Sequence, residues 1–345
     1  MATQPLTSDR LEFDDESEAI EYYFEQGWTD GLPVVPPTAD KVRKFLEWSD
    51  LAPSEILGTE PTKGRVITAE KVAINCVMAG CKPEYFPVVL AAVDAICEPQ
   101  FNLHAITVST MGAAVLMVVN GPISGELGIN SGVSVFGPGH RANATIGRAL
   151  RLVISNVTGA VSGVLDKATL GHAGKYTWCI AEAEDVSPWR PLHVERGVSL
   201  DEGAVTVFAG LSPTQVDFHV STDPEAILTR FSDAMFATGH GKGELVIVLC
   251  PEHVGHLKAA RWTKKQIREF LFEATHRKAS EWVRMGAMQE GEVDGDDSIP
   301  VALSPENITI VVAGGAAGAF SAVVPLWGGG SNSRSVTKKI KGSSR

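Results

Sequence analysis

Apolar residues recur in this chain at two different spacings, one typical of helices and the other of strands. Spacings of three and four residues predict helices, and a helix that is apolar at nearly every position is expected to be buried on all sides. The predicted helices cover residues 11–26, 39–48, 69–79, 83–96, 224–237 and 264–275. Gly27 and Gly80 are expected to end the first and the third of them.

Short runs that alternate or are apolar throughout predict strands between these helices. They cover residues 65–68, 102–110, 114–120, 175–182, 204–209, 215–220, 244–250 and 308–313. Strands interleaved with helices favour an α/β fold, with mixed sheets, helices on the sheet faces and two lobes. We expect an acidic segment and helix at residues 1–27, an α/β lobe with glycine-rich loops at 28–200, and an α/β lobe with a basic tail at 201–345.

The most informative stretch is residues 137–151, GPGHRANATIGRALR, where a Gly-Pro-Gly turn runs directly into a predicted helix. Free N–H groups and the positive end of the helix dipole suit such a junction to an anion, and arginine can bind a carboxylate in a fork. Neither a phosphate-loop nor a dinucleotide-binding fingerprint is present. The residues expected to bind the substrate here and on neighbouring loops are Asn130, His140, Arg141, Asn143, Arg148, Lys175 and Tyr176.

A purely structural role for this junction is the alternative. The apolar side chains of residues 146–157 form one helical stripe, which puts Arg141 and Arg148 on the roughly opposite face. Either arginine could be solvated, or could pair with acidic residues of another layer or subunit. The arginines line a pocket only if another segment covers their face, and residues 120–132 and 175–195 are the candidates for that cover.

Groups that can transfer protons are concentrated in residues 171–197, GHAGKYTWCIAEAEDVSPWRPLHVERG. Glu182 and His172 are the expected proton carriers. Cys81 lies at a break between two predicted helices, where a thiol can have a depressed pKa, and His104 lies on a predicted strand. Both are catalytic candidates, with a buried structural thiol and a hydrogen-bonded histidine as the alternatives. No spacing matches a known metal-ligand motif, so we expect neither a metal nor a cofactor.

Composition limits the class of protein. A chain of 345 residues with 44% hydrophobic and 21% charged residues suits one large or two ordinary globular domains. The net charge of −11 argues against a general nucleic-acid binder. No run of about eighteen apolar residues predicts a membrane span, and the polar start lacks signal-peptide features, so a cytoplasmic location is expected. Five cysteines without CxxC spacing fit reduced thiols.

Several longer motifs carry a resemblance to a known family. They are WTDGLPVVPPT, VMAGCKPEYFPVVLAA, NGPISGELGINSG, GPGHRANATIGRALRL, GKYTWCIAEAEDVSPWRPLHVERG and the closing segments IVVAGG and SRSVTKKI. Together they resemble a bacterial family associated with UGSC (seleno)protein domains, over residues 28–340. The Sec/Cys-Gly-Ser-Cys segment itself is absent from this chain. The resemblance therefore implies that such a thiol would lie in a partner chain.

Two functions are consistent with these features. The first is an enzyme or catalytic subunit of lyase, hydratase or hydrolase type, acting as a homo-oligomer on a small carboxylate or carbonyl compound held at residues 137–151. The second is a non-catalytic subunit that presents a substrate or thiol to a separate Cys/Sec protein. A metal-dependent enzyme is a third alternative. Neither nucleic acid nor a membrane is an expected partner.

Overall fold

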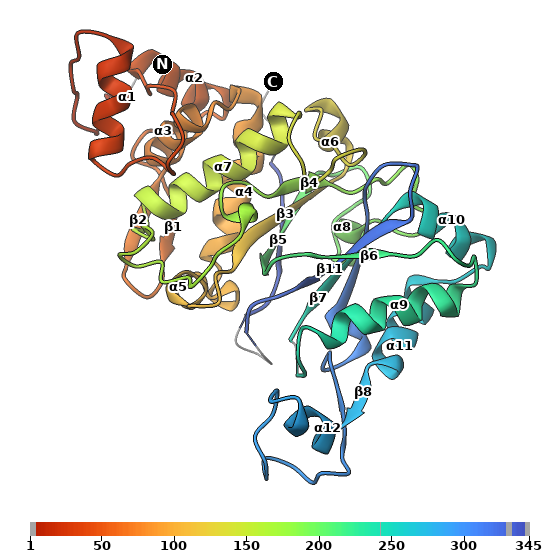
Figure 1. The fold of residues 1–345 in the computed structure, drawn as a ribbon. Helices are drawn as coiled ribbons and strands as arrows, with labels where there is room; N and C mark the ends of the chain where they lie inside the picture. Colours follow the sequence, from red (N-terminus) through yellow and green to blue (C-terminus); the bar gives the residue numbers. More distant parts are fainter. Residues whose placement is uncertain (1–4, 242, 329–332, 342–345) are drawn as a thin grey trace.

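Two four-stranded β-sheets lie face to face at the centre of the protein, and helices cover their outer faces (Figure 1). The structure is a computed structural model that describes residues 5–241, 243–328 and 333–341. The strand order of the first sheet is β4 (Cys179–Ala181), β3 (Ala114–Asn120), β5 (Ala204–Gly210) and β12 (Val336–Lys339). That of the second is β10 (Ile308–Val312), β7 (Leu245–Leu249), β11 (Phe320–Pro325) and β6 (Thr214–Asp217).

The alternation of side chains along each strand explains this stacking. In β3, Leu116 and Val118 face the second sheet, whereas Met117 and Val119 face the helices of the first. Strands that are apolar at every position can bury both faces at once. The continuous apolar runs of β3, β5, β7 and β10 therefore favour a position between another sheet and a layer of helices, and the protein has four layers in the order α–β–β–α.

Each sheet has its own set of covering helices. On the first sheet lie α4 (Phe86–Cys97) and α7 (Arg141–Asn156), with α3 (Ala69–Ala79) packed on α7 and α2 (Ala39–Trp48) packed on α3. On the outer side of the second sheet lie α9 (Pro224–Phe236), α10 (Pro251–Ala259) and α11 (Lys264–Ala274). Shorter elements are α1 (Glu16–Glu25), α5 (Leu103–Val108), α6 (Pro122–Glu126), α8 (Leu192–Glu195), α12 (Ala279–Arg284), and the hairpins β1–β2 (Ile56–Glu60, Arg65–Thr68) and β8–β9 (His276–Lys278, Ser298–Pro300). Within the described ranges, no helix is long and apolar enough to cross a membrane.

The two sheets repeat one topology. In each, a central strand pairs in parallel with an edge strand and antiparallel with a third strand, which pairs antiparallel with the fourth. The fourth strands are exchanged: β6 follows β5 in sequence but joins the second sheet, and β12 follows β11 but joins the first. The third strands begin alike, with GAVTVFAG at residues 203–210 and GAFSAVVP at 318–325. Two strands from beyond residue 200 thus complete the first sheet, so the predicted lobe boundary does not separate the sheets.

The α/β class with mixed sheets is confirmed, and most predicted elements are present. Residues 102–110, predicted as a strand, contain helix α5 instead, because Leu103, Ile106 and Thr107 share its buried face at helical spacing. The strand predicted at residues 175–182 is shorter than expected. Only Cys179–Ala181 pairs with β3, and the preceding residues begin with a 3₁₀ turn, η3 (Ala173–Lys175).

The predicted basic tail is in part an edge strand. Residues 336–339 form β12, which pairs with β5. Lys338 pairs with Asp94 and Glu98, and Lys339 with Glu202. Carboxylates in and just after α4, and of the residues before β5, therefore neutralise these two lysines within the chain. Residues 342–345 lie outside the described residues.

Candidate active site

The glycine-rich junction at residues 137–151 uses its arginines for internal bonds. Helix α7 begins at Arg141, whose guanidinium donates two hydrogen bonds to the Gly80 carbonyl at 3.1 and 2.9 Å. Arg148 forms a two-pronged ion pair with Asp30, with both N···O distances at 2.7 Å. Arg148 therefore pairs with an acidic residue of another layer, as the structural alternative expected. Both arginines anchor neighbouring loops.

Asn143 is also fully engaged. Its Oδ1 accepts from the Asn130 backbone N–H at 2.8 Å, and its Nδ2 donates to the carbonyls of Asn130 and Cys179 at 2.9 and 3.0 Å. The Asn130 side chain bonds within its own loop. His140 stands exposed before the helix and makes no capping hydrogen bond. The two segments expected to cover α7, residues 120–132 and 175–195, do contact it at Asn143, through hydrogen bonds that hold the elements together.

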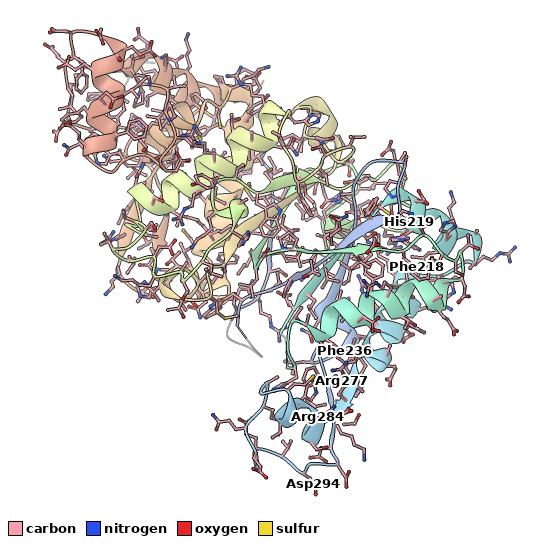
Figure 2. The ribbon with its side chains drawn as sticks, viewed as in Figure 1. Phe218, His219, Phe236, Arg277, Arg284 and Asp294 are labelled. Atoms are coloured by element: carbon pink, nitrogen blue, oxygen red, sulfur yellow. The ribbon has the colours of Figure 1, made fainter. Side chains whose placement is uncertain are left out.

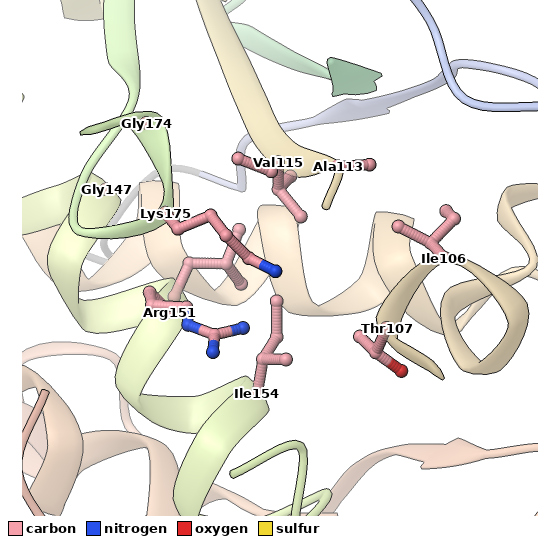
Figure 3. Close-up of a pocket in the computed structure, with 11 residues that line it drawn as sticks. Ile106, Thr107, Ala113, Val115, Gly147, Arg151, Ile154, Gly174 and Lys175 are labelled. Carbon is pink, nitrogen blue, oxygen red and sulfur yellow. The ribbon is translucent and has the colours of Figure 1, made fainter. Parts of the chain in front are cut away.

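Further along α7, Arg151 and Lys175 line a small cavity with Thr107 and apolar side chains of α5, β3 and α7 (Figure 3). Its volume is about 20 Å³, enough for one water-sized group. Both cations share Asp166, at 3.0 Å from Arg151 and 2.7 Å from Lys175. Burial would raise the pKa of Asp166, but hydrogen bonds and the charges of Lys175 and Arg151 lower it overall. The cavity holds a water more readily than a carboxylic acid.

His172 and Tyr176 lie beside this region without facing Glu182. His172 accepts from the Gly174 N–H through Nδ1 at 3.2 Å, so its Nε2–H donates to the Gly210 carbonyl at 3.2 Å. Burial lowers the pKa of His172, against the opposing effect of that Gly210 hydrogen bond. Tyr176 is half exposed.

The other two catalytic candidates are also separate from one another. The Cys81 thiol is buried and donates to the Thr145 carbonyl at 3.2 Å, an arrangement that matches its structural alternative. His104 lies on helix α5, and its Nδ1 is 3.9 Å from Glu60 Oε1. The sequence-predicted candidates therefore do not meet in one site.

Glu182 is the candidate with the most chemically distinctive surroundings. It follows β4 directly, beside Asn120, the last residue of the parallel strand β3. Asn120 Nδ2 donates to Glu182 Oε2 at 2.7 Å and to Glu184 Oε1 at 2.8 Å, and the Leu192 N–H donates to Glu182 Oε2 at 2.7 Å. Two donors thus occupy Oε2, so a proton carried by Glu182 sits on Oε1.

A lysine from the second half of the chain completes this cluster. Lys264, the first residue of α11, is 4% exposed, and its Nζ lies 3.7 Å from Glu182 Oε1. The same ammonium donates to the Arg190 carbonyl at 2.8 Å and to Glu195 Oε2 at 3.2 Å. Side chains of Glu184 and Glu195 are each 22% exposed, so the cluster meets solvent at these two carboxylates.

Unsatisfied polar atoms are concentrated in this cluster. Six buried side-chain N or O atoms of the described residues have no hydrogen-bond partner, and four of them are Asn120 Oδ1, Glu182 Oε1 and both ring nitrogens of His193. His193 is fully buried, with Nδ1 3.8 Å from Glu184 Oε1. Buried polar groups are normally hydrogen-bonded, because an unpaired one costs about 1–3 kcal/mol. Such a group of them marks a place that is not optimised for stability alone.

The electrostatics of Glu182 suit proton transfer. Burial raises the pKa of this carboxyl, and the opposing effects of Lys264, Leu192 and Asn120 do not fully offset it. A carboxyl with a raised pKa can hold a proton at higher pH and release it to a reacting group. The neighbouring ammonium of Lys264 is placed to stabilise negative charge on an oxygen near Oε1.

Sequence reasoning identified Glu182 but not its main partners. Asn120 was the end of a predicted strand and Lys264 the start of a predicted helix, each unremarkable by itself. The sequence signal that could have pointed to Asn120 was its position at the end of a strand, since functional side chains gather beyond the carboxyl ends of parallel strands. The pairing of β3 with β4 could not be read from the pattern.

Comparison of the chain with protein-family models, with curated proteins and with solved structures gives no match. The resemblance to the UGSC-associated family, and the Cys/Sec partner that it implies, therefore stay predictions. In the part of the chain that the structure describes, no group of three or more His, Cys, Asp and Glu side chains is placed to hold a metal ion.

Proposed function

We propose that this protein is an enzyme of lyase or hydratase type, with hydrolysis as the related alternative, that transfers a proton on a small carboxylate or carbonyl compound. Glu182 is its proton carrier. The bare Oε1 of Glu182 supports this function most directly, because it is a buried, hydrogen-bond-free carboxylate oxygen on a group with a raised pKa. The sequence suggested the same reaction class from the same residue.

Lys264 supplies the substrate contact in this proposal. In this proposal the substrate is held at Lys264 rather than at residues 137–151, because Lys264 Nζ lies 3.7 Å from the bare Oε1 of Glu182. Arg141 and Arg148 instead bond Gly80 and Asp30. An oxygen of the substrate that approaches both Lys264 Nζ and Glu182 Oε1 receives a hydrogen bond from the ammonium. Charge that develops on this oxygen during proton transfer is stabilised by the same ammonium.

The test is solvent deuterium exchange and conversion of four named probes: pyruvate, oxaloacetate, malate and fumarate. The protein is incubated with each in D₂O and followed by proton NMR. We expect deuterium at a carbon next to a carbonyl, or hydration of the double bond, in at least one probe. Glu182→Gln should slow this reaction by about 10²–10⁴-fold, the range that general acid–base catalysis contributes.

Glu244→Gln is the matched control. Glu244 is also a buried carboxylate, but Ser335 satisfies both of its oxygens, through its N–H at 2.6 Å and its hydroxyl at 2.8 Å. This variant should keep the wild-type exchange rate. A folded Glu182→Gln variant with undiminished exchange, or a wild-type protein that leaves all four probes unchanged, would count against the proposal.

A further inference from the structure

The second parallel strand pair ends in a different set of reactive groups. Strand β7 runs into Cys250, which caps the N-terminus of α10, and β10 runs into a loop of glycine and alanine at residues 313–319. The side chains of His253, on α10, and Ser321, on β11, converge on this cysteine. None of the three was a candidate from sequence, because Ser321 lies on a strand far along the chain from Cys250 and His253.

Hydrogen bonding fixes which nitrogen of His253 can act as a base. Its Nε2 lies 3.2 Å from the Phe218 carbonyl, which can only accept, so Nε2 carries a proton in both charge states. Phe218 belongs to the segment between β6 and α9 (Figure 2). The nitrogen that titrates is therefore Nδ1, which lies 2.7 Å from Ser321 Oγ.

Ser321 couples this nitrogen to the cysteine. Its Oγ accepts from the Cys250 backbone N–H at 2.9 Å, which leaves its own proton free to choose a partner. That proton goes to Nδ1 while His253 is neutral, and to the sulfur once Nδ1 is protonated. An activated-thiol centre consists of a nucleophile, a base and a group that orients the base, here a carbonyl.

The charges around the Cys250 thiol also favour its activation. Burial would raise the pKa of Cys250, but hydrogen bonds from His253 and Ser321 and the charge of His253 lower it overall. Burial would lower the pKa of His253, but Cys250, the Phe218 carbonyl and the charge of Glu252 raise it. Glu252 is thus a charged group outside the pair that acts on His253.

The loop over Cys250 is built from residues without bulky side chains. A side chain at Gly314 would lie 3.8 Å from Cys250 Cβ, so the loop backbone passes directly over the cysteine. The Gly314 N–H donates to the Ser131 carbonyl at 2.8 Å, which ties this cover to the other half of the chain. Cys250 is 2% exposed, so a reactant can reach it only if this cover is displaced.

We propose that Cys250, His253 and Ser321 form a second reactive site, in which the thiol adds to the carbonyl carbon of a small uncharged compound. As Sγ forms the bond to carbon, the Ser321 hydroxyl proton passes to His253 Nδ1 and Ser321 Oγ takes the thiol proton. The carbonyl π pair moves to oxygen, which takes the proton back from Nδ1. The product is a thiohemiacetal, and the step needs no oxidant or reductant.

The first test compares thiols within the wild-type protein. Native protein is treated with iodoacetamide across about pH 5.5–9, and each cysteine peptide is quantified by mass spectrometry. We expect Cys250 to react at least tenfold faster than Cys97 at about pH 6.5. Cys97 is the more exposed thiol, and burial and nearby carboxylates raise its pKa to about 11. Access alone therefore predicts the opposite order, and an excess of Cys97 labelling overturns the proposal.

Variants then test the roles of the partners. His253→Gln should move the rise of Cys250 alkylation to the ordinary thiol range near about pH 8.5, and Ser321→Ala should slow it at low pH without preventing folding. Acetaldehyde should protect Cys250, saturably, and leave Cys97 unprotected. A pH profile that both variants leave unchanged overturns the base assignment, and absence of protection overturns the carbonyl assignment.

Discussion

The two parallel strand pairs of this protein have the same topology but end in opposite chemistry. Beyond β3 and β4 lie charged groups with empty hydrogen-bonding positions, centred on Glu182 and Lys264. Beyond β7 and β10 lie Cys250 and His253, and both ring nitrogens of His253 have hydrogen-bond partners. A loop of glycine and alanine covers Cys250. One topology therefore offers two similar positions for reactive groups, and the side chains decide how each is used.

Each strand end is also covered by the other half of the chain. Lys264 belongs to the connection between β7 and β10 but contacts Glu182 of the first sheet. Ser131 belongs to the connection between β3 and β4 but accepts the N–H of Gly314 in the second. The Ala183 N–H, next to Glu182, donates to the carbonyl of Val312 in β10 at 2.8 Å. The two ends are therefore assembled together, and neither is complete in one half of the sequence.

The largest difference between the two ends should be their sensitivity to loss of one partner. Lys264→Met removes a buried cation and leaves Glu182 and Glu195 without it, which should lower the free energy of unfolding by about 3–5 kcal/mol. Ser321→Ala removes an uncharged partner and should cost about 1–3 kcal/mol. Urea unfolding of both variants measures the difference. A Lys264→Met variant that is the more stable of the two would contradict the charged character assigned to the first end.

Sequence patterns predicted the elements of this fold better than its contacts. The buried strands at residues 114–120 and 308–313 were recognised because their apolar runs need no partner to be seen. Helix α5 was missed because residues 102–110 begin with the polar–apolar alternation of a strand, whereas the buried Leu103, Ile106 and Thr107 follow helical spacing. The exchange of β6 and β12 between sheets leaves no periodic signal at all.

The candidate site shows the same limit for side chains. Arg148 and Asp30 are far apart in sequence, so the sequence offered pairing with an acidic residue only as an alternative and could not identify Asp30 as the partner. Lys264 and Glu182 are equally distant, and their proximity depends on the stacking of the two sheets. Sequence could identify which residue types carry chemistry, but their partners come from long-range packing.

A smaller effect, of opposite sign at the two ends, is expected in the pH dependence of stability. Glu182 has a raised pKa in the folded protein, so its carboxyl contributes stability below its usual value of 4.5 and loses it as pH rises through the raised pKa. Cys250 has a lowered pKa, so it contributes stability above its usual value of 9.0 and loses it as pH falls through the lowered pKa.

Matched variants separate the pH dependence of stability that Glu182 contributes from the one that Cys250 contributes. Relative to the wild type, Glu182→Gln should gain thermal stability as pH rises from about 4 to 8, because glutamine cannot ionise. Cys250→Ser should instead lose stability relative to the wild type as pH approaches 9. Melting temperatures of the three proteins across this range provide the measurement. Slopes of the same sign for both variants would show that the two ends do not differ in the way their hydrogen bonds indicate.

The smallest effect should come from Arg141→Ala, which alters neither strand end. Arg141 is exposed and bonds only a carbonyl, that of Gly80, among its described hydrogen bonds, so its loss should cost about 0.5–1 kcal/mol in urea unfolding. Deuterium exchange on the four carboxylate probes and alkylation of Cys250 should both keep their wild-type rates. If exchange instead fell as far as in Glu182→Gln while the protein stayed folded, the substrate would be held at residues 137–151. The first strand end would then be a structural polar cluster, and the contrast between the two ends would no longer separate two reactive sites.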